Sequence, residues 1–254
     1  MPAIAILNRT TILDDVHVAP VVRALQVQVT RDFAPIWGRD ADLVLVPRGA
    51  VPPVGAWQLV LADTSDEAGA LGYHDFTREG MPLGKVGVKT SMADGGRWEV
   101  TASHEVLEIL ADPDIIRCVF IQRSARSGLI VAQEICDAVE ADPLGYDING
   151  VPVSDFVTPE WFESGRPPGV PFSFRKNVAA PLTLARGGYI SVFRVGRSAG
   201  WTQVTARSSE HLYDALEHSE VTPPSGYLKL PRLGSRRERR ARARDFWMPS
   251  KEEV

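Results

Sequence analysis

The segment 101–113 constrains the fold more than any other part of the chain. If it is a helix, its apolar side chains gather on one face and side chains that can bind a cation or a proton gather on the other. The apolar face consists of Ala102, Val106, Ile109, Leu110 and Pro113, and the polar face of Thr101, His104, Glu105, Glu108 and Asp112. No lysine or arginine occurs from Trp98 to Ile116, although a solvated acidic face usually carries some. We therefore expect the apolar face to pack under a sheet and the acidic face to surround a cation, which neutralises the concentrated charge.

The spacing in His104-Glu105-x-x-Glu108 favours a metal site. One helical turn separates His104 from Glu108, so both side chains project from the same face, and Glu105 can reach a water molecule held between them. The arrangement is that of the His-Glu-x-x-His zinc helix with glutamate in place of the second histidine. Carboxylate oxygen is an accepted zinc ligand, so a site is possible. The same short pattern also fits the solvated stripe of an amphipathic helix.

A second group of acids, within 131–140, can complete such a site. A catalytic zinc ion takes three protein ligands and leaves a fourth position for water, so one ligand must come from outside the helix. Glu134 is the first choice for this ligand, and Asp137 is the alternative. Whichever of the two does not bind the metal is expected to hydrogen-bond His104 or to fix the loop. The competing interpretation is that Glu134 ends a strand and faces solvent.

These residues resemble a known pattern. Ser103-His104-Glu105-x-x-Glu108, followed by Asp112-Pro113 and by Glu134-Ile135-x-Asp137, is similar to a pattern in His-Glu-x-x-Glu metallopeptidases of bacteria and to the corresponding stretch of the plant exordium-like secreted proteins. The similarity covers residues 100–140, and more loosely the chain up to 195 resembles a bacterial and phage-associated family. The resemblance implies a zincin-like fold in which His104, Glu108 and either Glu134 or Asp137 surround a metal ion. The extracellular role of the plant proteins does not transfer, because the chain has neither a secretory leader nor a cysteine framework.

The first half of the chain predicts the elements of such a fold. Apolar runs predict strands at 3–7, 43–46, 57–61 and 85–89, and apolar residues at helical spacing predict a helix at 19–37. The metal helix is expected from Trp98 to Asp112, stopped by Pro113. We expect a mixed sheet over this helix, with 84–89 as an edge strand that can pair with an extended peptide. The predicted fold class is α/β (α+β), with a zincin-like mixed sheet over a metal-binding helix.

The second half predicts a β-rich C-terminal extension. The stretches 117–123 and 129–135 predict a hairpin that carries Glu134 back towards the helix, and Asn149-Gly150 predicts a tight hairpin. Further strands are expected at 182–184 and 189–195, and a last helix at 208–218. We expect a single domain over 1–222, in which 1–115 forms the sheet and the motif helix and 116–222 forms the third-ligand segment and the extension. A linker and an arginine-rich tail follow over 223–254.

Charge is distributed unevenly along the chain. Seven arginines, the first Arg232 and the last Arg244, and one glutamate give this tail segment a charge of +6, so the rest carries −10 of the total of −4. Clustered guanidinium groups bind phosphates, and Phe246-Trp247 could stack on bases or anchor in a protein, which predicts nucleic acid or an assembly partner. The alternative is a disordered tail that keeps the chain soluble.

The number of cysteines and the length of the apolar runs indicate in which cellular compartment the protein is expected. Cys118 and Cys136 form no disulfide framework, and buried free thiols are the favoured interpretation. The start of the chain lacks a basic leader, and no apolar run is long enough for a membrane span. We therefore expect no signal peptide and no membrane partner, and a location in the bacterial cytoplasm or in a particle assembled there.

Other side chains have weaker claims to chemistry. His74 is expected in a loop before the edge strand, where a histidine bonded to its own turn is the favoured interpretation and a ligand the alternative. His211 and His218 are expected at the surface of an amphipathic helix. Tyr146 and Tyr189 could each stabilise a developing oxyanion, but no spacing selects between them and packing is the favoured role for both.

Together these features predict metal-dependent hydrolysis of a peptide or protein substrate. Zn²⁺ would be held by His104, Glu108 and either Glu134 or Asp137, with Glu105 as the general base. Two carboxylates and one imidazole largely cancel the charge of the ion, which predicts modest activity and leaves Mn²⁺ or Ca²⁺ open. The rival hypothesis is a non-catalytic structural or assembly protein, of a phage-like particle, that retains the zincin fold.

Overall fold

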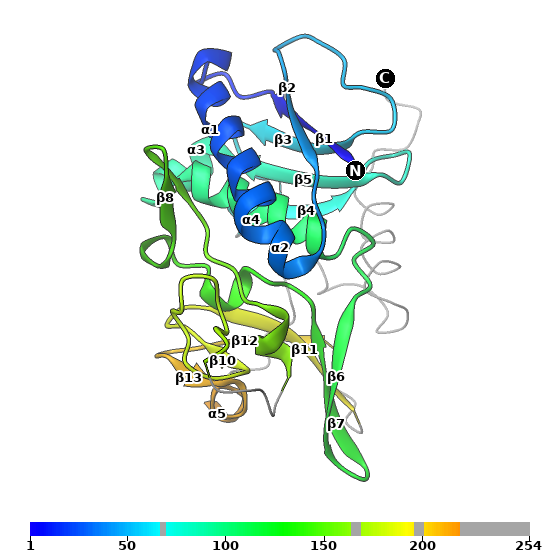
Figure 1. Ribbon diagram of the computed structural model, residues 1–254, viewed down its shortest axis with the longest axis vertical. Helices are drawn as coiled ribbons and strands as arrows, with labels where there is room; N and C mark the ends of the chain where they lie inside the picture. The colour runs from blue at the N-terminus through cyan, green and yellow to red at the C-terminus, as the bar shows by residue number, and fades with distance from the viewer. Residues whose placement is uncertain (67–69, 164–168, 196–200, 219–254) are drawn as a thin grey trace.

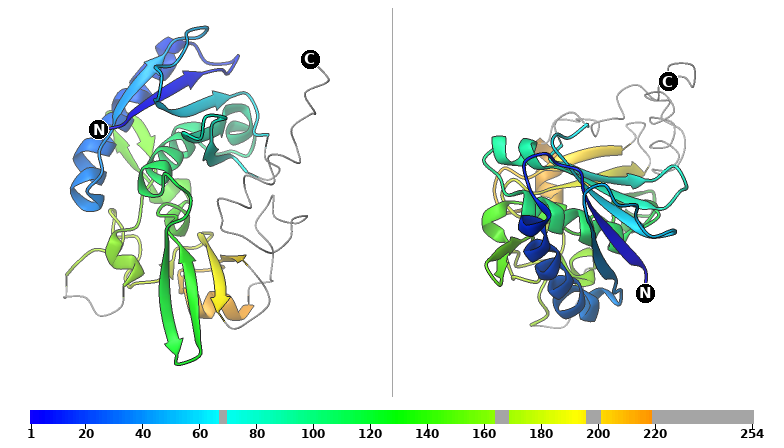
Figure 2. Two further views of the ribbon diagram at one scale, coloured as in Figure 1. Left: turned by 90° about the vertical axis from the view of Figure 1, so that its right-hand side faces the viewer. Right: turned by 90° about the horizontal axis from the view of Figure 1, so that it is seen from above.

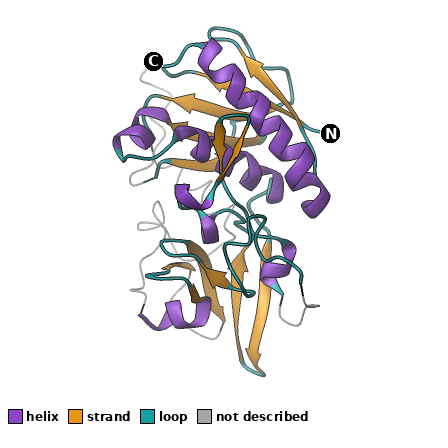
Figure 3. Cartoon of the chain, turned by 60° about the vertical axis from the view of Figure 1, so that its left-hand side comes forward, coloured by secondary structure: helices purple, strands orange, loops and turns teal. Residues whose placement is uncertain are grey.

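The computed structural model describes residues 1–66, 70–163, 169–195 and 201–218. These residues form an upper and a lower part, each built around a sheet (Figures 1 and 3). The combination of helices with a mixed sheet and an antiparallel sheet confirms the predicted α/β (α+β) class. The tail segment from Arg232 to Arg244 lies outside the described residues.

The upper sheet has the strand order β2-β1-β3-β5-β4. Its strands are β1 (Ala3–Asn8), β2 (Asp42–Val46), β3 (Trp57–Ala62), β4 (Gly72–Phe76) and β5 (Pro82–Gly87). The first four strands in this order run parallel, and β4 is antiparallel to β5 at the edge. The sheet is therefore mixed, as the sequence predicts.

The prediction of 84–89 as the edge strand is wrong. β5 is an internal strand between β3 and β4, and the strand at this edge is β4, whose residues are predicted from the sequence to lie in a loop. Within β4, His74 and Phe76 are buried, whereas the residues between and before them are only half-buried. This alternation is a strand signal, but hydrophobicity does not reveal it because one of the two inward side chains is an imidazole.

Helices cover one face of this sheet. α1 (Asp15–Val27) continues through a π-helical turn, Gln28–Phe33, into α2 (Ala34–Trp37), which ends at Gly38 in the left-handed conformation. α4 (Trp98–Ala111) is the predicted motif helix, and the short α3 (Val88–Ala93) precedes it. α1 and α4 contact each other as well as the strands, so they share a face of the sheet (Figure 1). Among the described residues, no helix combines the length and the apolar character needed to cross a bilayer.

The main core lies between this face of the sheet and the helices. Ile4 and Ile6 on β1 belong to the large apolar cluster that includes Leu25 of α1 and Leu107 of α4. The residue between them, Ala5, belongs to a separate small cluster with other apolar residues of the parallel strands and the β2–β3 connection. Alternate residues of β1 therefore serve opposite faces, as a strand requires.

A buried hydrogen-bond network fixes α4 against the π-helical turn that follows α1. The hydroxyl of Ser103 donates to Gln28 Oε1 at 2.7 Å and accepts the backbone N–H of Ser154 at 2.9 Å. Gln28 Nε2 donates to the carbonyl oxygen of Ser154 at 2.9 Å. A fully satisfied buried network specifies one arrangement of the helices. Because Ser103 immediately precedes His104, this network also sets the rotation of the motif helix.

The lower sheet is antiparallel, with the order β12-β11-β7-β6. Its strands are β6 (Cys118–Ser124), β7 (Ser127–Ala132), β11 (Tyr189–Val195) and β12 (Trp201–Thr205), and the predicted β6–β7 hairpin projects from the body (Figure 2).

The remaining elements are the hairpin of β8 (Tyr146–Ile148) and β9 (Val151–Val153), the pair of β10 (Thr183–Leu184) and β13 (Glu210–His211), α5 (Leu212–His218), and the 3₁₀ helices Asp137–Val139, Asp142–Leu144 and Pro159–Phe162. Positive φ angles at Asn149 and Gly150 confirm the predicted tight turn.

Candidate metal centre

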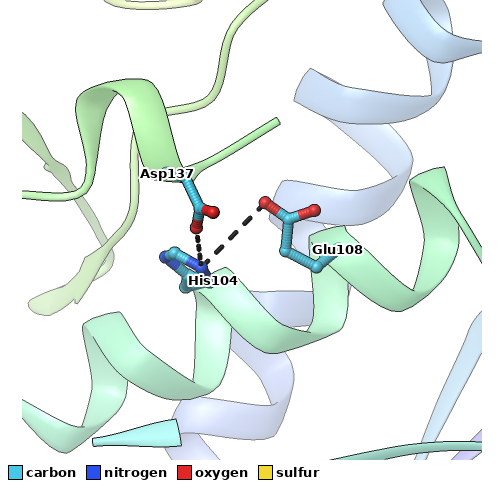
Figure 4. Close-up of side chains that lie close together, drawn as sticks. All are labelled: His104, Glu108 and Asp137. Atoms are coloured by element: carbon cyan, nitrogen blue, oxygen red, sulfur yellow. Dashed lines mark ion pairs between the residues drawn. The ribbon is translucent and has the colours of Figure 1, made fainter. Parts of the chain in front are cut away.

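α4 and the segment after β7 bring three potential ligands together. His104 Nε2 lies 4.0 Å from Glu108 Oε1, one turn along the helix, and 3.1 Å from Asp137 Oδ1. Figure 4 shows the three side chains directed toward one another, two from α4 and one from the 3₁₀ helix Asp137–Val139. One ligand atom from each residue lies within 4.8 Å of the others, so the group could hold a metal ion.

Backbone hydrogen bonds hold Asp137 in place. The N–H of Cys136 donates to Glu108 Oε1 at 2.7 Å and ties the segment before Asp137 to α4. On the other side, the N–H of Ala185 donates to the carbonyl oxygen of Ala138 at 2.9 Å. Asp137 is therefore anchored both to the motif helix and to the lower part of the molecule.

Glu108 is a deeply buried carboxylate whose charge is incompletely compensated by hydrogen bonds. Its side chain is 1% exposed, and its Oε2 atom has no hydrogen-bond partner among the residues that the structure describes. A buried acceptor without a partner costs about 1–3 kcal/mol, and more when it is charged. A divalent cation between Glu108, His104 and Asp137 would neutralise the buried carboxylate, and imidazole with carboxylate is a donor set that such cations accept.

Charge and burial shift the pKa values of all three side chains. Burial lowers the pKa of His104, but the hydrogen bond to Asp137 and the charges of the neighbouring acids outweigh it and raise this pKa to about 10. Burial and the charge of Asp137 raise the pKa of Glu108 well above its ordinary value. Burial also raises the pKa of Asp137, against the hydrogen bond from His104. In the absence of a cation the centre therefore retains protons.

Metal-free protein is expected to lose stability as the pH rises. The pKa of His104 is raised from 6.5 to about 10, so its contribution is complete below pH 6.5 and is lost as the pH approaches 10. Burial and the charge of Asp137 raise the pKa of Glu140 from 4.5 to about 8, so its ionisation penalises the folded state increasingly between these values. Each proton contributes a slope of up to about 1.4 kcal/mol per pH unit.

Urea unfolding between pH 6 and 10, with a chelator present, measures this dependence. A free energy of unfolding that stays constant or increases over the range would contradict the coupling of these groups. Added divalent cation should reduce the loss, since metal ligands bind in their deprotonated forms.

Glu134, the first choice from the sequence, lies outside the group of three. It is buried, with 5% exposure, and its charge raises the pKa of both Glu108 and Asp137, so it lies near the centre. The geometry favours Asp137, the alternative, as the third ligand. β7 ends at Ala132, and the chain turns before the 3₁₀ helix that begins at Asp137. The spacing of Glu134 and Asp137 in the sequence does not specify which of them this turn directs toward His104.

Glu105 lies beneath the edge of the upper sheet, beside His74. The side chain of Glu105 is buried, and its Oε2 atom is 3.7 Å from Nδ1 of His74. His74 is itself 6% exposed and belongs to β4, so its predicted position in a loop is wrong. An imidazole so close to Glu105 can orient the carboxylate and balance its charge.

Two glycines allow the strands to approach Glu105. A Cβ atom at Gly72 would lie 2.8 Å from Glu105 Oε1, and one at Gly84 would lie 3.3 Å from Glu105 Cβ and 2.7 Å from Leu59 Cδ1. Gly84 is also the direct cross-strand partner of His74. The absence of a side chain at both positions therefore permits the close packing of β4 and β5 on α4.

The variant Gly84→Ala is expected to destabilise the protein by about 1–3 kcal/mol, because the added methyl group overpacks the contact with Leu59 and Glu105. Lys85→Ala in the same strand is the matched control. Lys85 pairs with the exposed Asp66, and such surface pairs contribute about 1 kcal/mol or less. The free energies of unfolding in urea should differ accordingly; equal costs would show that the strands do not approach α4 this closely.

Of the two candidate tyrosines, Tyr189 lies among the acids. A hydrogen bond with Tyr189 lowers the pKa of Asp137 against the effect of burial. Burial and the charge of Asp137 raise the pKa of Tyr189 well above its ordinary value, so its phenol stays a hydrogen-bond donor. Tyr146 instead donates to Asp32 Oδ2 at 2.8 Å and serves the packing near α1. Glu140 also borders the centre. It lies outside the motif, and its place in the same acidic run, 131–140, is the one signal in the sequence that points to it.

The other residues considered from the sequence serve local structure. Asp112 accepts two backbone N–H groups from the turn that follows α4. The predicted helical position of His211 is wrong, because His211 lies on β13. His218 does lie on a helix, α5, and pairs with Glu210 at 2.7 Å. Both cysteines are free thiols.

Comparison with known proteins adds no assignment. No family model, no curated protein and no solved structure matches the chain at a significant level. The resemblance to His-Glu-x-x-Glu metallopeptidases therefore stays a prediction that rests on the motif residues.

Proposed function

We propose that the protein is a metal-dependent hydrolase that cleaves peptide bonds. The observation that carries this proposal is the convergence of His104, Glu108 and Asp137, whose potential ligand atoms lie within 4.8 Å of one another, around the nearly fully buried carboxylate of Glu108. Two carboxylates and one imidazole match the three protein ligands of a catalytic zinc ion. Zn²⁺ is therefore the best candidate, and the oxygen-rich donor set also admits Mn²⁺ or Ca²⁺.

The roles of the side chains follow from their positions. A bound ion would lower the pKa of a water molecule and polarise the carbonyl group to be cleaved. Glu105 would accept the proton of that water and deliver it to the leaving amine, with His74 holding the carboxylate in one orientation. Tyr189, which stays protonated, would donate a hydrogen bond to the oxygen that becomes negatively charged.

The edge of the upper sheet supports a peptide as the substrate. Among the described strands, none pairs with the outer edge of β4. An extended peptide can add to such an edge through backbone hydrogen bonds. Because β4 carries His74 beside Glu105, a peptide bound there would lie next to the general base.

Elemental analysis and a peptide library test this function together. Purified protein is expected to contain about one divalent ion per chain and to cleave library peptides, and a chelator should abolish cleavage until Zn²⁺ is restored. Metal-loaded protein that cleaves nothing would contradict the hydrolase and favour the rival, an assembly protein whose metal site is structural.

A further inference from the structure

A pocket lies at the end of the lower sheet that is distant from the candidate metal centre. It has a volume of about 410 Å³ and is lined by residues at the ends of β6, β7 and β11 and by residues of α5. Strand β11 runs from Tyr189 at the metal centre to Arg194 in this pocket, and five residues of strand span roughly 17 Å. The pocket is therefore separate from the candidate metal centre, and its volume falls in the range of small-molecule sites, roughly 300–1,000 Å³.

The strand register and the helix period explain why its side chains gather. Arg194 on β11 is directly opposite Leu129 on β7, and residues so paired project from the same face of a sheet. Arg123 stands at the irregularity near the end of β6, where a bulge can redirect a side chain. On α5, the lining residues Tyr213, Leu216 and Glu217 occur at intervals of three and four and so share one helix face. Figure 2 shows α5 beside the strands of the lower sheet.

Two guanidinium groups line the pocket, and one of them has an N–H donor without an acceptor among the described residues. Arg194 Nη2 donates to the carbonyl oxygen of Leu216 at 3.3 Å, while its buried Nε has no hydrogen-bond partner among the residues that the structure describes. The guanidinium of Arg123 lies 4.2 Å from the ring centre of Tyr213. Among the lining residues that the structure describes, Glu217 is the one acid, so two positive charges face one negative charge there. A buried N–H group without an acceptor is unfavourable, and a bound anion would satisfy it.

We propose that this pocket binds a small molecule that carries a carboxylate on an apolar body. A guanidinium group presents parallel N–H donors that match the two oxygens of a carboxylate. Leu129 and Leu216 supply aliphatic surface for the rest of the molecule. This site goes beyond the proposed hydrolysis and does not depend on it.

The test compares N-acetyl-leucine with N-acetyl-leucinamide, which differ only in the carboxylate, by calorimetry on the full chain. The acid is expected to bind, and the amide to bind at least about tenfold more weakly, because it lacks the charge that the arginines recognise. Arg194→Met and Arg123→Gln should each weaken binding of the acid at least about tenfold. Arg126→Gln, an exposed arginine of the same hairpin outside the pocket, is the matched control and should leave affinity unchanged.

Three results would overturn the proposal. Equal binding of acid and amide would show that the arginines do not recognise the ligand. Binding of inorganic phosphate without binding of N-acetyl-leucine would identify a phosphate site instead. Equal losses in Arg123→Gln and Arg126→Gln would indicate a diffuse effect of charge; because Arg123 is exposed, its variant keeps the test valid if Arg194→Met does not fold.

Discussion

Replacing Glu105 by glutamine is expected to lower kcat for peptide cleavage by about 10²–10⁴-fold, the usual contribution of a general base. Glutamine preserves the size of the buried side chain, but its amide cannot accept a proton from water. Metal affinity should stay close to that of the wild type, because Glu105 does not belong to the ligand group. Cleavage assays combined with metal titration separate these two properties.

Glu99→Gln is the matched control, since Glu99 lies in the first turn of the same helix and outside the ligand group. This variant should retain the activity of the wild type. If Glu105→Gln keeps metal and also keeps activity within about tenfold of the wild type, the proton is accepted elsewhere and the role of Glu105 is refuted.

The second large effect is expected for the third ligand. Asp137→Asn should weaken metal binding by at least about 100-fold, because loss of a group that only supports a ligand already costs roughly 10–100-fold. The stabilisation that a saturating cation gives to the folded state should fall by about 2.7 kcal/mol for each 100-fold loss in affinity. Thermal unfolding at a fixed concentration of Zn²⁺ measures this difference.

Glu134→Gln provides the comparison, because Glu134 is equally buried but lies outside the group of three. The substitution removes the negative charge of Glu134 near the centre but leaves all three proposed ligands in place. Metal affinity should therefore fall by much less than in Asp137→Asn. The opposite order of effects would identify Glu134 as the ligand and refute the assignment of Asp137.

The motif helix could be predicted because its signals are local. The same-face placement of His104 and Glu108 depends on a single helical turn, and the acidic face depends on residues within the segment itself. The strands β1, β2 and β3 are likewise predicted locally, because each contains an apolar run of strand length. The tight turn at Asn149-Gly150 is specified by two residues that tolerate positive φ.

The details that the sequence could not supply depend on contacts between distant segments. The order in which strands add to a sheet is not encoded in any one strand, so neither the internal position of β5 nor the edge position of β4 follows from its own residues. For the same reason, no local pattern indicates the contact between His74 and Glu105, which are far apart in sequence. The choice between Asp137 and Glu134 depends on the turn after β7, where tertiary hydrogen bonds fix the backbone.

The hydrogen bond from the Cys136 amide to Glu108 has a consequence for how fast an ion can be captured. Because this bond already secures the neighbouring aspartate to the helix, the entropy lost in closing the intervening loop is incurred when the chain folds. Binding then does not require a mobile segment to become ordered. A preorganised site of this kind gains affinity because the loss of conformational entropy does not occur at the moment of association. Capture should accordingly be governed by dehydration of the ion and departure of the imidazolium proton.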